Sequence, residues 1–152
     1  MDKYMKVAYD TAASGVLNNC GGPFGAVVVK DGVIVGKGCN SVLKNNDPTA
    51  HGEVMAIRDA CKNLSTYDLS GCSIYTTSYP CPMCLSAIIW ANIDKIYYGS
   101  TKEDAANIGF RDDYIYKVIN NMNQTDFLVK EIDRDETIKL LEDYSKNNKT
   151  IY

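Results

Sequence analysis

The chain has 152 residues, of which 45% are hydrophobic, and it carries a formal net charge of −3. This length suits one domain with a proper core and is too short for two ordinary domains. The sequence pI is about 5.1, and no tract of basic residues occurs, which disfavours a protein that tracks the phosphates of a long nucleic acid. A small-molecule substrate is compatible with this charge.

The sequence also favours a soluble protein of the cytoplasm. Its start, Met1-Asp2-Lys3-Tyr4, lacks the apolar stretch of a signal peptide. No run approaches the roughly 20 apolar residues of a membrane span. In the cytoplasm the six cysteines would be reduced thiols rather than a disulfide framework. Four of them are expected as small core or near-core residues, namely Cys20, Cys39, Cys61 and Cys72.

A helix and a hairpin are expected in the first third of the chain. The helix covers residues 4–18 and ends at the glycine-rich segment that begins at Cys20. Two β-branched runs then flank Asp31-Gly32, which is the strongest short-range signal of a β-hairpin. Further on, Asp47 can cap a second helix with Pro48 in its first turn. Apolar residues at helical spacing extend that helix to Leu64.

Strands and helices alternate in the rest of the chain. The patterns predict, in order, a strand at 72–77, a helix from Pro82 to Trp90, a strand at 95–98, a helix near 101–107, a strand at 127–130 and a helix from 134 to about 148. Together with the earlier elements, this order indicates an α/β fold. We expect residues 1–152 to form a single three-layer α/β/α sandwich with a mixed central sheet.

The chain contains one histidine, which begins the segment His51-Gly52-Glu53. About 30 residues later comes Pro80-Cys81-Pro82-Met83-Cys84. A His-x-Glu followed by a Pro-Cys-x-x-Cys is typical of zinc-dependent nucleobase and nucleoside deaminases. An imidazole and two thiolates would hold Zn²⁺ and leave its fourth position for water. Glu53 would not be a ligand, but would carry protons from the attacking water to the ring and the leaving amine.

The spacing of these residues also predicts where the metal would lie. His51 and Glu53 are two positions apart, about 200° around a helix, so both reach one metal only beyond the helix end. Cys81 and Cys84 are three positions apart and share one face at a second helix start. Two helix N-termini would favour thiolates over thiols there. The alternative to a metal site is a buried histidine whose neighbouring cysteines have no related role. That alternative would require four residue types and a proline to match the motif by coincidence.

Four segments resemble the cytidine deaminase superfamily and, within it, the bacterial guanine deaminases. They are Gly21-Gly22-Pro23-Phe24-Gly25-Ala26-Val27, Asn46-Asp47-Pro48-Thr49-Ala50-His51, Pro80-Cys81-Pro82-Met83-Cys84, and Gly109-Phe110 with Asp112, Tyr116 and Lys117. The resemblance runs from the first helix to about residue 120 and is looser after that. It implies a cytidine deaminase-like fold, Zn²⁺ as cofactor, and a hydrolase of guanine catabolism that converts guanine to xanthine and ammonia.

The resemblance also implies four substrate contacts. Phe24 would stack on the purine, and Asn40 and Asp112 would hydrogen-bond its polar edge. Tyr152 would close the pocket of the partner subunit in a domain-swapped homodimer. Each residue has a structural alternative. Phe24 could belong to the core, Asn40 could be an ordinary turn residue, Asp112 could be solvated, and Tyr152 ends a chain terminus of a kind that often frays.

Two positions depart from the family pattern. Gly52 stands where the family usually has alanine. A glycine inside a helix costs roughly 0.5–1 kcal/mol, but less in an opening turn, so we expect it to be tolerated. Tyr79 stands before Pro80, where guanine deaminases usually carry glutamate. The loss of that charge near the site leaves the exact substrate open.

Three other functions fit parts of the sequence. One is deamination of another small amino-heterocycle, such as cytosine or an aminotriazine. A second is deamination of tRNA adenosine, which the acidic pI and the lack of a basic tract disfavour. The third is a non-catalytic, zinc-stabilised binding module. Glu53 argues against such a module, because structural zinc needs no proton shuttle and usually takes four protein ligands.

Overall fold

A mixed sheet forms the centre of the protein. The structure is a computed structural model that describes residues 1–124, 126–147 and 150–152. Its four-stranded sheet has the order β2-β1-β3-β4. The strands are β1 (Gly25–Lys30), β2 (Val33–Cys39), β3 (Ser73–Ser78) and β4 (Lys95–Ser100). Strand β1 is antiparallel to β2 and to β3, and β3 is parallel to β4, so the predicted mixed sheet is confirmed.

The first two strands form the predicted hairpin. Lys30 pairs with Val33 across the turn. The two residues between them, Asp31 and Gly32, have φ angles of 49° and 78°. Positive φ at both central positions is the geometry of a type I′ turn, whose twist matches that of the flanking strands. The Asp-Gly pair is therefore what closes this hairpin.

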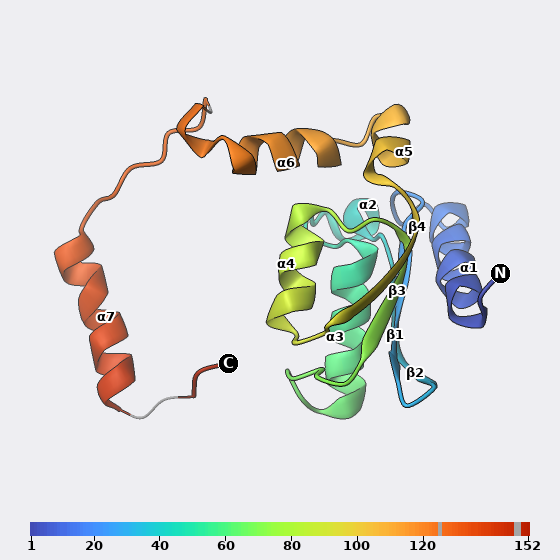
Figure 1. Cartoon of the computed structure of the whole chain (residues 1–152), viewed down its shortest axis with the longest axis horizontal. Helices are drawn as coiled ribbons and strands as arrows, with labels where there is room; N and C mark the ends of the chain where they lie inside the picture. The colour runs from blue at the N-terminus through green and yellow to red at the C-terminus, as the bar shows by residue number, and fades with distance from the viewer. Residues whose placement is uncertain (125, 148–149) are drawn as a thin grey trace. The chain divides into compact units, whose positions relative to one another are not determined.

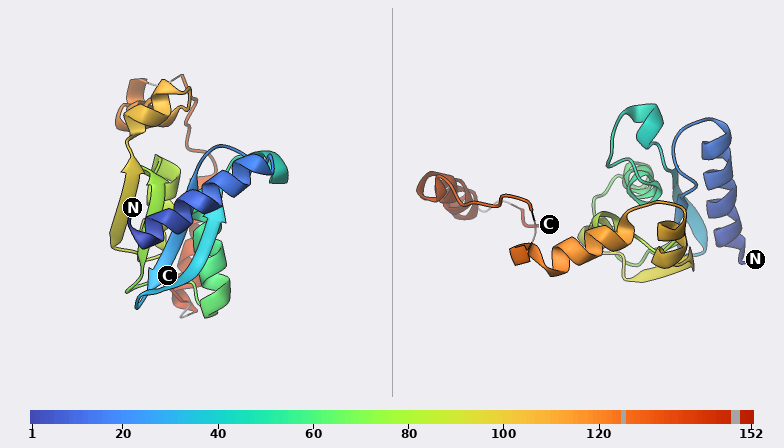
Figure 2. Two further views of the ribbon diagram at one scale, coloured as in Figure 1. Left: turned by 90° about the vertical axis from the view of Figure 1, so that its right-hand side faces the viewer. Right: turned by 90° about the horizontal axis from the view of Figure 1, so that it is seen from above.

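Helices cover both faces of the sheet (Figure 1; Figure 2, left). Val27 packs with Ala8 of the first helix, whereas its neighbour Val28 packs with Ala56 and Ile88 of the other helical layer. Successive side chains of a strand point to opposite faces, so β1 contributes to both layers. The helices of these layers are α1 (Lys3–Leu17) on one face and α3 (Gly52–Leu64) with α4 (Pro82–Trp90) on the other. The predicted three-layer α/β/α sandwich is confirmed.

The rest of the chain is mostly helical. The remaining elements are α2 (Val42–Asn45), α5 (Lys102–Asn107), α6 (Asp112–Asn120), the 3₁₀ helix η1 (Met122–Gln124) and α7 (Arg134–Lys146). Helix α6 was not predicted, and the strand predicted at 127–130 is wrong, since the structure has no strand at those residues. A strand is defined by hydrogen bonds to a neighbour, which a sequence pattern alone does not supply.

The chain divides into two units, Met1–Lys117 and Val118–Tyr152. The first unit contains the whole sheet. In the second unit α7, all of whose residues are described, has no buried residue. Large apolar side chains are exposed throughout this unit, including Leu128, Val129, Ile132, Leu140, Leu141 and Ile151. Within the described ranges, no helix has the length and apolar character needed to cross a membrane.

Strand β2 approaches the first turns of α3 at a glycine. A Cβ atom on Gly38 would lie 2.5 Å from the backbone nitrogen of Ala56 and 2.7 Å from the carbonyl oxygen of Gly52. Both atoms belong to the helix backbone, which cannot rotate aside as a side chain can. The missing side chain at Gly38 therefore sets how closely the start of α3 lies on the sheet.

Substitution at Gly38 tests this close approach. Gly38→Ala should lower the free energy of unfolding by about 1–3 kcal/mol, because the added methyl group overpacks the contact. Urea denaturation of the purified protein measures this loss. Lys37→Ala, at the exposed neighbouring position of β2, is the control and should change stability by less than about 0.5 kcal/mol. Equal, small effects of the two substitutions would contradict the tight contact.

Candidate active site

Three side chains converge where α3 and α4 begin. His51 is the residue immediately before α3, Cys81 is the residue immediately before α4, and Cys84 lies in the first turn of α4. The His51 Nδ1 atom lies 3.6 Å from the Cys81 Sγ and 3.5 Å from the Cys84 Sγ. All three potential ligand atoms lie within 4.8 Å of one another. The structure thus brings together the three residues that the sequence predicted as metal ligands.

Their spacing fits a tetrahedral zinc ion. Zn–S bonds of about 2.3 Å and Zn–N bonds of about 2.0–2.1 Å place N and S about 3.6 Å apart in a tetrahedron. The two His51–cysteine distances match this value. In the part of the chain that the structure describes, no fourth side chain joins this possible metal site. Three protein ligands and one open position are the pattern of catalytic rather than structural zinc.

Hydrogen bonds within the cluster bias the protonation of its members. The pKa of Cys81 is lowered, chiefly because the Cys84 thiol donates a hydrogen bond to it. The same contact raises the pKa of Cys84. The pKa of His51 is raised, first by its hydrogen bond with Cys81. The cluster therefore favours a thiolate at Cys81, which is the form that binds a cation.

The helix that follows His51 begins later than the sequence predicted. Asp47 does not cap it, because its Oδ1 accepts hydrogen bonds from the backbone N–H of Thr49 at 2.8 Å and from the Thr49 hydroxyl at 2.6 Å. These bonds close a separate turn, and α3 begins only at Gly52. His51 consequently lies just outside the helix, and Glu53 lies in its first turn.

Glu53 lies beside the three possible ligands and is only 6% exposed. The Thr76 hydroxyl, on β3, lies 3.3 Å from the Glu53 Oε1 and 3.1 Å from the Ser78 carbonyl oxygen, and can donate to either. Burial is the main cause that raises the pKa of Glu53, because it penalises the charged form. A carboxyl group whose pKa moves toward neutrality is suited to taking up and releasing a proton.

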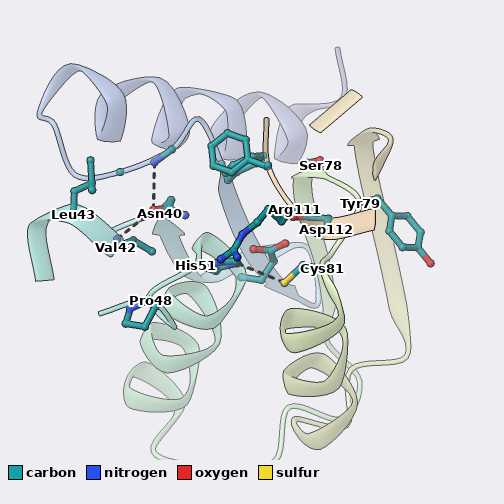
Figure 3. Close-up of a pocket in the computed structure, with 15 residues that line it drawn as sticks. Asn40, Val42, Leu43, Pro48, His51, Ser78, Tyr79, Cys81, Arg111 and Asp112 are labelled. Carbon is teal, nitrogen blue, oxygen red and sulfur yellow. Dashed lines mark hydrogen bonds between the residues drawn. The ribbon is translucent and has the colours of Figure 1, made fainter. Parts of the chain in front are cut away.

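A pocket of about 460 Å³ opens beside this cluster (Figure 3). Its lining includes six residues that the sequence predicted for the site, namely Phe24, Asn40, His51, Glu53, Cys81 and Asp112. Cys84, which is fully buried, completes the ligand cluster behind the lining. All of these residues belong to the first unit. The predicted residues alone therefore combine the possible metal site with one aromatic and two polar side chains.

The polar and aromatic residues of the pocket have defined partners. Phe24 packs edge-to-face against Phe110, with ring centroids 4.7 Å apart. The Asn40 Oδ1 accepts hydrogen bonds from the backbone N–H groups of Gly22 at 3.3 Å and Val42 at 3.2 Å. The pKa of Asp112 is raised, first because the carboxyl group is partly buried. Asp112 is thus neither fully solvated nor remote from the ligands.

Tyr152 belongs to the second unit, so its role at a pocket stays a prediction. The Tyr79 side chain points away from the pocket (Figure 3), and its ring lies 5.0 Å from that of Tyr98 and 6.5 Å from that of Tyr116. The Tyr116 hydroxyl in turn donates to the Pro80 carbonyl at 2.9 Å. Tyr79 is therefore among the residues that line the pocket, but its ring is directed toward Tyr98 and Tyr116.

Sequence reasoning missed four residues of the site. Phe110 and Arg111 line the pocket, and the Arg111 side chain extends over His51 in the view of Figure 3. Thr76 contacts Glu53, and Ser78 lines the pocket two positions further along β3. The alternation of strand β3 could have placed Thr76 and Ser78 on one face. It could not have shown that this face meets Glu53.

Comparison with known proteins gives a consistent result. Residues 1–100 match the family described as the cytidine and deoxycytidylate deaminase zinc-binding region. The chain is 51% identical over 119 residues to the guanine deaminase of Bacillus subtilis (strain 168), which covers 78% of this chain and 76% of that protein. The X-ray structure of guanine deaminase from Bacillus subtilis superposes with a TM-score of 0.91 at 42% identity, covering 100% of this chain and 99% of that one.

The more distant relatives include proteins with a second activity, tRNA-specific adenosine deamination. The chain is 33% identical over 146 residues to a tRNA-specific adenosine deaminase of Buchnera aphidicola subsp. Schizaphis graminum, across 95% of this chain and 91% of that protein. A guanine deaminase structure from Nitrosomonas europaea matches with a TM-score of 0.67 at 29% identity, covering 70% and 62% of the two chains. The family match includes the sheet, Glu53 and the three possible ligands, so the chain belongs to the zinc-binding cytidine and deoxycytidylate deaminase family and, within it, to the bacterial guanine deaminases.

Proposed function

We propose that this chain is a zinc-dependent hydrolytic deaminase that converts guanine to xanthine and ammonia. The observation that carries the proposal is the buried Glu53 beside a three-ligand cluster with tetrahedral zinc spacing. A proton shuttle next to an open metal position is what hydrolytic deamination needs. The choice of guanine is supported by the similarity to guanine deaminase over the full length of the chain.

In this proposal His51, Cys81 and Cys84 hold Zn²⁺. When bound, Zn²⁺ lowers the pKa of a coordinated water to about 7, so that a nucleophile is available at neutral pH. Glu53 takes one proton from the attacking water and delivers it to a ring nitrogen, and then takes the second proton from the hydroxyl group added to the ring carbon and delivers it to the departing amine, which leaves as ammonia. Thr76 holds the Glu53 carboxyl group in position through its hydroxyl.

The pocket residues would bind and orient the base. Phe24, braced by Phe110, presents an aromatic surface for stacking. Because the Asn40 Oδ1 is already engaged by two backbone N–H groups, Asn40 would offer its amide N–H to an acceptor of the base. Asp112 would accept hydrogen bonds from ring N–H and amino groups. This combination of one donor and one acceptor residue suits the polar edge of guanine.

Two other classes of substrate compete with guanine. The tRNA-specific adenosine deaminase relative favours adenosine in tRNA, while the net charge of −3 disfavours a polyanionic substrate. A smaller ring, cytosine or an aminotriazine, would also enter the pocket. Ammonia release from guanine, cytosine, adenine, guanosine, an aminotriazine and tRNA separates these possibilities. Turnover of guanine well above that of the other compounds is the expected result.

The metal assignment predicts about one zinc ion per chain in the purified protein. Cys84→Ala should lose most of this zinc and much of its thermal stability, because metal binding is coupled to folding. Metal analysis and thermal unfolding measure the two effects. Cys61→Ala is the matched control, since Cys61 packs at the edge of the core and is not part of the ligand cluster. Full zinc retention in Cys84→Ala would contradict the assignment of Cys84 as a zinc ligand.

The shuttle role predicts a different outcome at Glu53. Glu53→Gln should keep its zinc and its fold but lose about 10²–10⁴-fold in kcat, because an amide cannot carry the proton. The measurement is steady-state ammonia release together with metal content. Glu103→Gln, on the exposed first turn of α5, is the control and should retain full activity. A loss of less than tenfold at Glu53 would point to a non-catalytic zinc module instead.

We also propose that residues 1–152 form one deaminase domain that works as a cytoplasmic homodimer with exchanged C-terminal segments. Strand β4 ends the sheet order and has one unpaired edge in the described chain, which is a ready site for another strand. The exposed apolar residues of Val118–Tyr152 need a surface to cover them. Exchange of identical segments would supply both. The cytoplasmic location is proposed because the six cysteines, all in described segments, are free thiols that a reducing compartment would preserve.

Subunit complementation tests the exchange. One variant lacks Tyr152 but keeps Glu53, and the other keeps Tyr152 but carries Glu53→Ala. Each homodimer should be nearly inactive. If the C-terminal segment completes the partner's site, a mixed dimer contains one site with both groups, and ammonia release should return after subunit exchange. A mixed dimer verified by mass spectrometry that stays inactive would rule out the shared site.

A further inference from the structure

The last side chain of β3 points toward the reaction site. Burial alternates along this strand, with Ile74, Thr76 and Ser78 buried. Ile74 belongs to the core beneath α3 and α4, and the Thr76 hydroxyl lies within hydrogen-bonding distance of Glu53. Because side chains two positions apart share one face of a strand, Ser78 extends the same face toward Cys81. Its place at the end of β3, above Asp112, is visible in Figure 3.

The Ser78 hydroxyl has no hydrogen-bond partner. Ser78 is only 4% exposed, and among the described residues its Oγ is the buried side-chain polar atom without a partner. The neighbouring polar groups Asn40, Glu53 and Thr76 all have partners within the chain. Leaving a buried hydroxyl unpaired is unfavourable. A group of this kind that also lines a pocket is expected to find its partner in a bound molecule.

We propose that the Ser78 hydroxyl hydrogen-bonds the base in the pocket and is a further substrate-binding residue of this site. The inference rests on the proposed function, since it takes the pocket to be a base-binding site. A hydroxyl group donates one hydrogen bond and accepts others, so it can meet either a ring nitrogen or an N–H group of the base. Ser78 thereby adds a third polar contact to those of Asn40 and Asp112.

The test separates substrate binding from a structural role. Ser78→Ala is placed in the Glu53→Gln protein, in which hydrolysis is suppressed, and the Kd for 8-azaguanine, a guanine analogue, is measured by calorimetry. We expect binding about 3- to 10-fold weaker, the usual value of one hydrogen bond. Zinc content should be unchanged. The urea midpoint of the ligand-free protein should be unchanged or higher, because no protein group loses a partner.

Ser41→Ala in the same background is the matched control. Ser41 is also buried, but its hydroxyl donates to the Cys39 carbonyl at 3.1 Å, and it is not among the residues that line the pocket. It should show the opposite pattern, with a lower urea midpoint and an unchanged Kd. Ser78→Cys, which keeps the side-chain size but is a weak donor, should resemble Ser78→Ala and serves if the alanine variant does not fold.

The outcomes distinguish this proposal from the proposed function. An unchanged Kd in Ser78→Ala, or a loss of stability with an unchanged Kd, would overturn the role of Ser78 alone. If the parent protein binds cytosine or an aminotriazine instead of 8-azaguanine, guanine as substrate is wrong, and the Ser78 variants are compared on the ligand that binds. If the parent binds none of these compounds, both proposals fall.

Discussion

The His51 Nδ1 atom lies 3.5 and 3.6 Å from two cysteine sulfurs because α3 and α4 begin side by side. Neither helix alone supplies enough ligands, so the metal site exists only where the two N-termini meet. That meeting depends on how closely α3 lies on the sheet, and Gly38 allows the close approach. The positive ends of both helices also favour the thiolate form that binds a metal.

Burial changes the pKa of the neighbouring carboxyl group, that of Glu53. Glu53 follows His51 by two positions, but it is held inside the protein with the Thr76 hydroxyl as partner. Desolvation raises its pKa, whereas the same residue on the surface would be an ordinary anion. The site thus separates two roles that the motif places almost side by side. His51 lies just outside the helix with its Nδ1 atom near the two cysteine sulfurs, and Glu53 lies in the first turn, where we propose that it carries protons.

The second unit leaves much of its apolar surface exposed. Residues Val118–Tyr152 expose many apolar side chains, with Leu128 at 90% and Ile151 at 82%. Burying apolar surface contributes about 25 cal/mol per Å², so a segment with this composition is stabilised mainly by what it packs against. An exchanged C-terminal segment in a homodimer would account both for this exposure and for the open edge of β4.

The sequence by itself determined the hairpin at Asp31-Gly32, the layers of the sandwich and the identity of the ligand cluster, because each depends on local spacing or local turn chemistry. It did not determine where α3 begins, since Asp47 bonds to Thr49 instead of capping that helix. Nor did it show that 127–130 would lack a strand, because strand pairing requires a distant neighbour. Only the tertiary structure decided that the Tyr79 ring points away from the pocket, that Thr76 contacts Glu53 and that Ser78 lines the pocket. Those directions follow from the packing of β3 against α3 and α4, which no local pattern encodes.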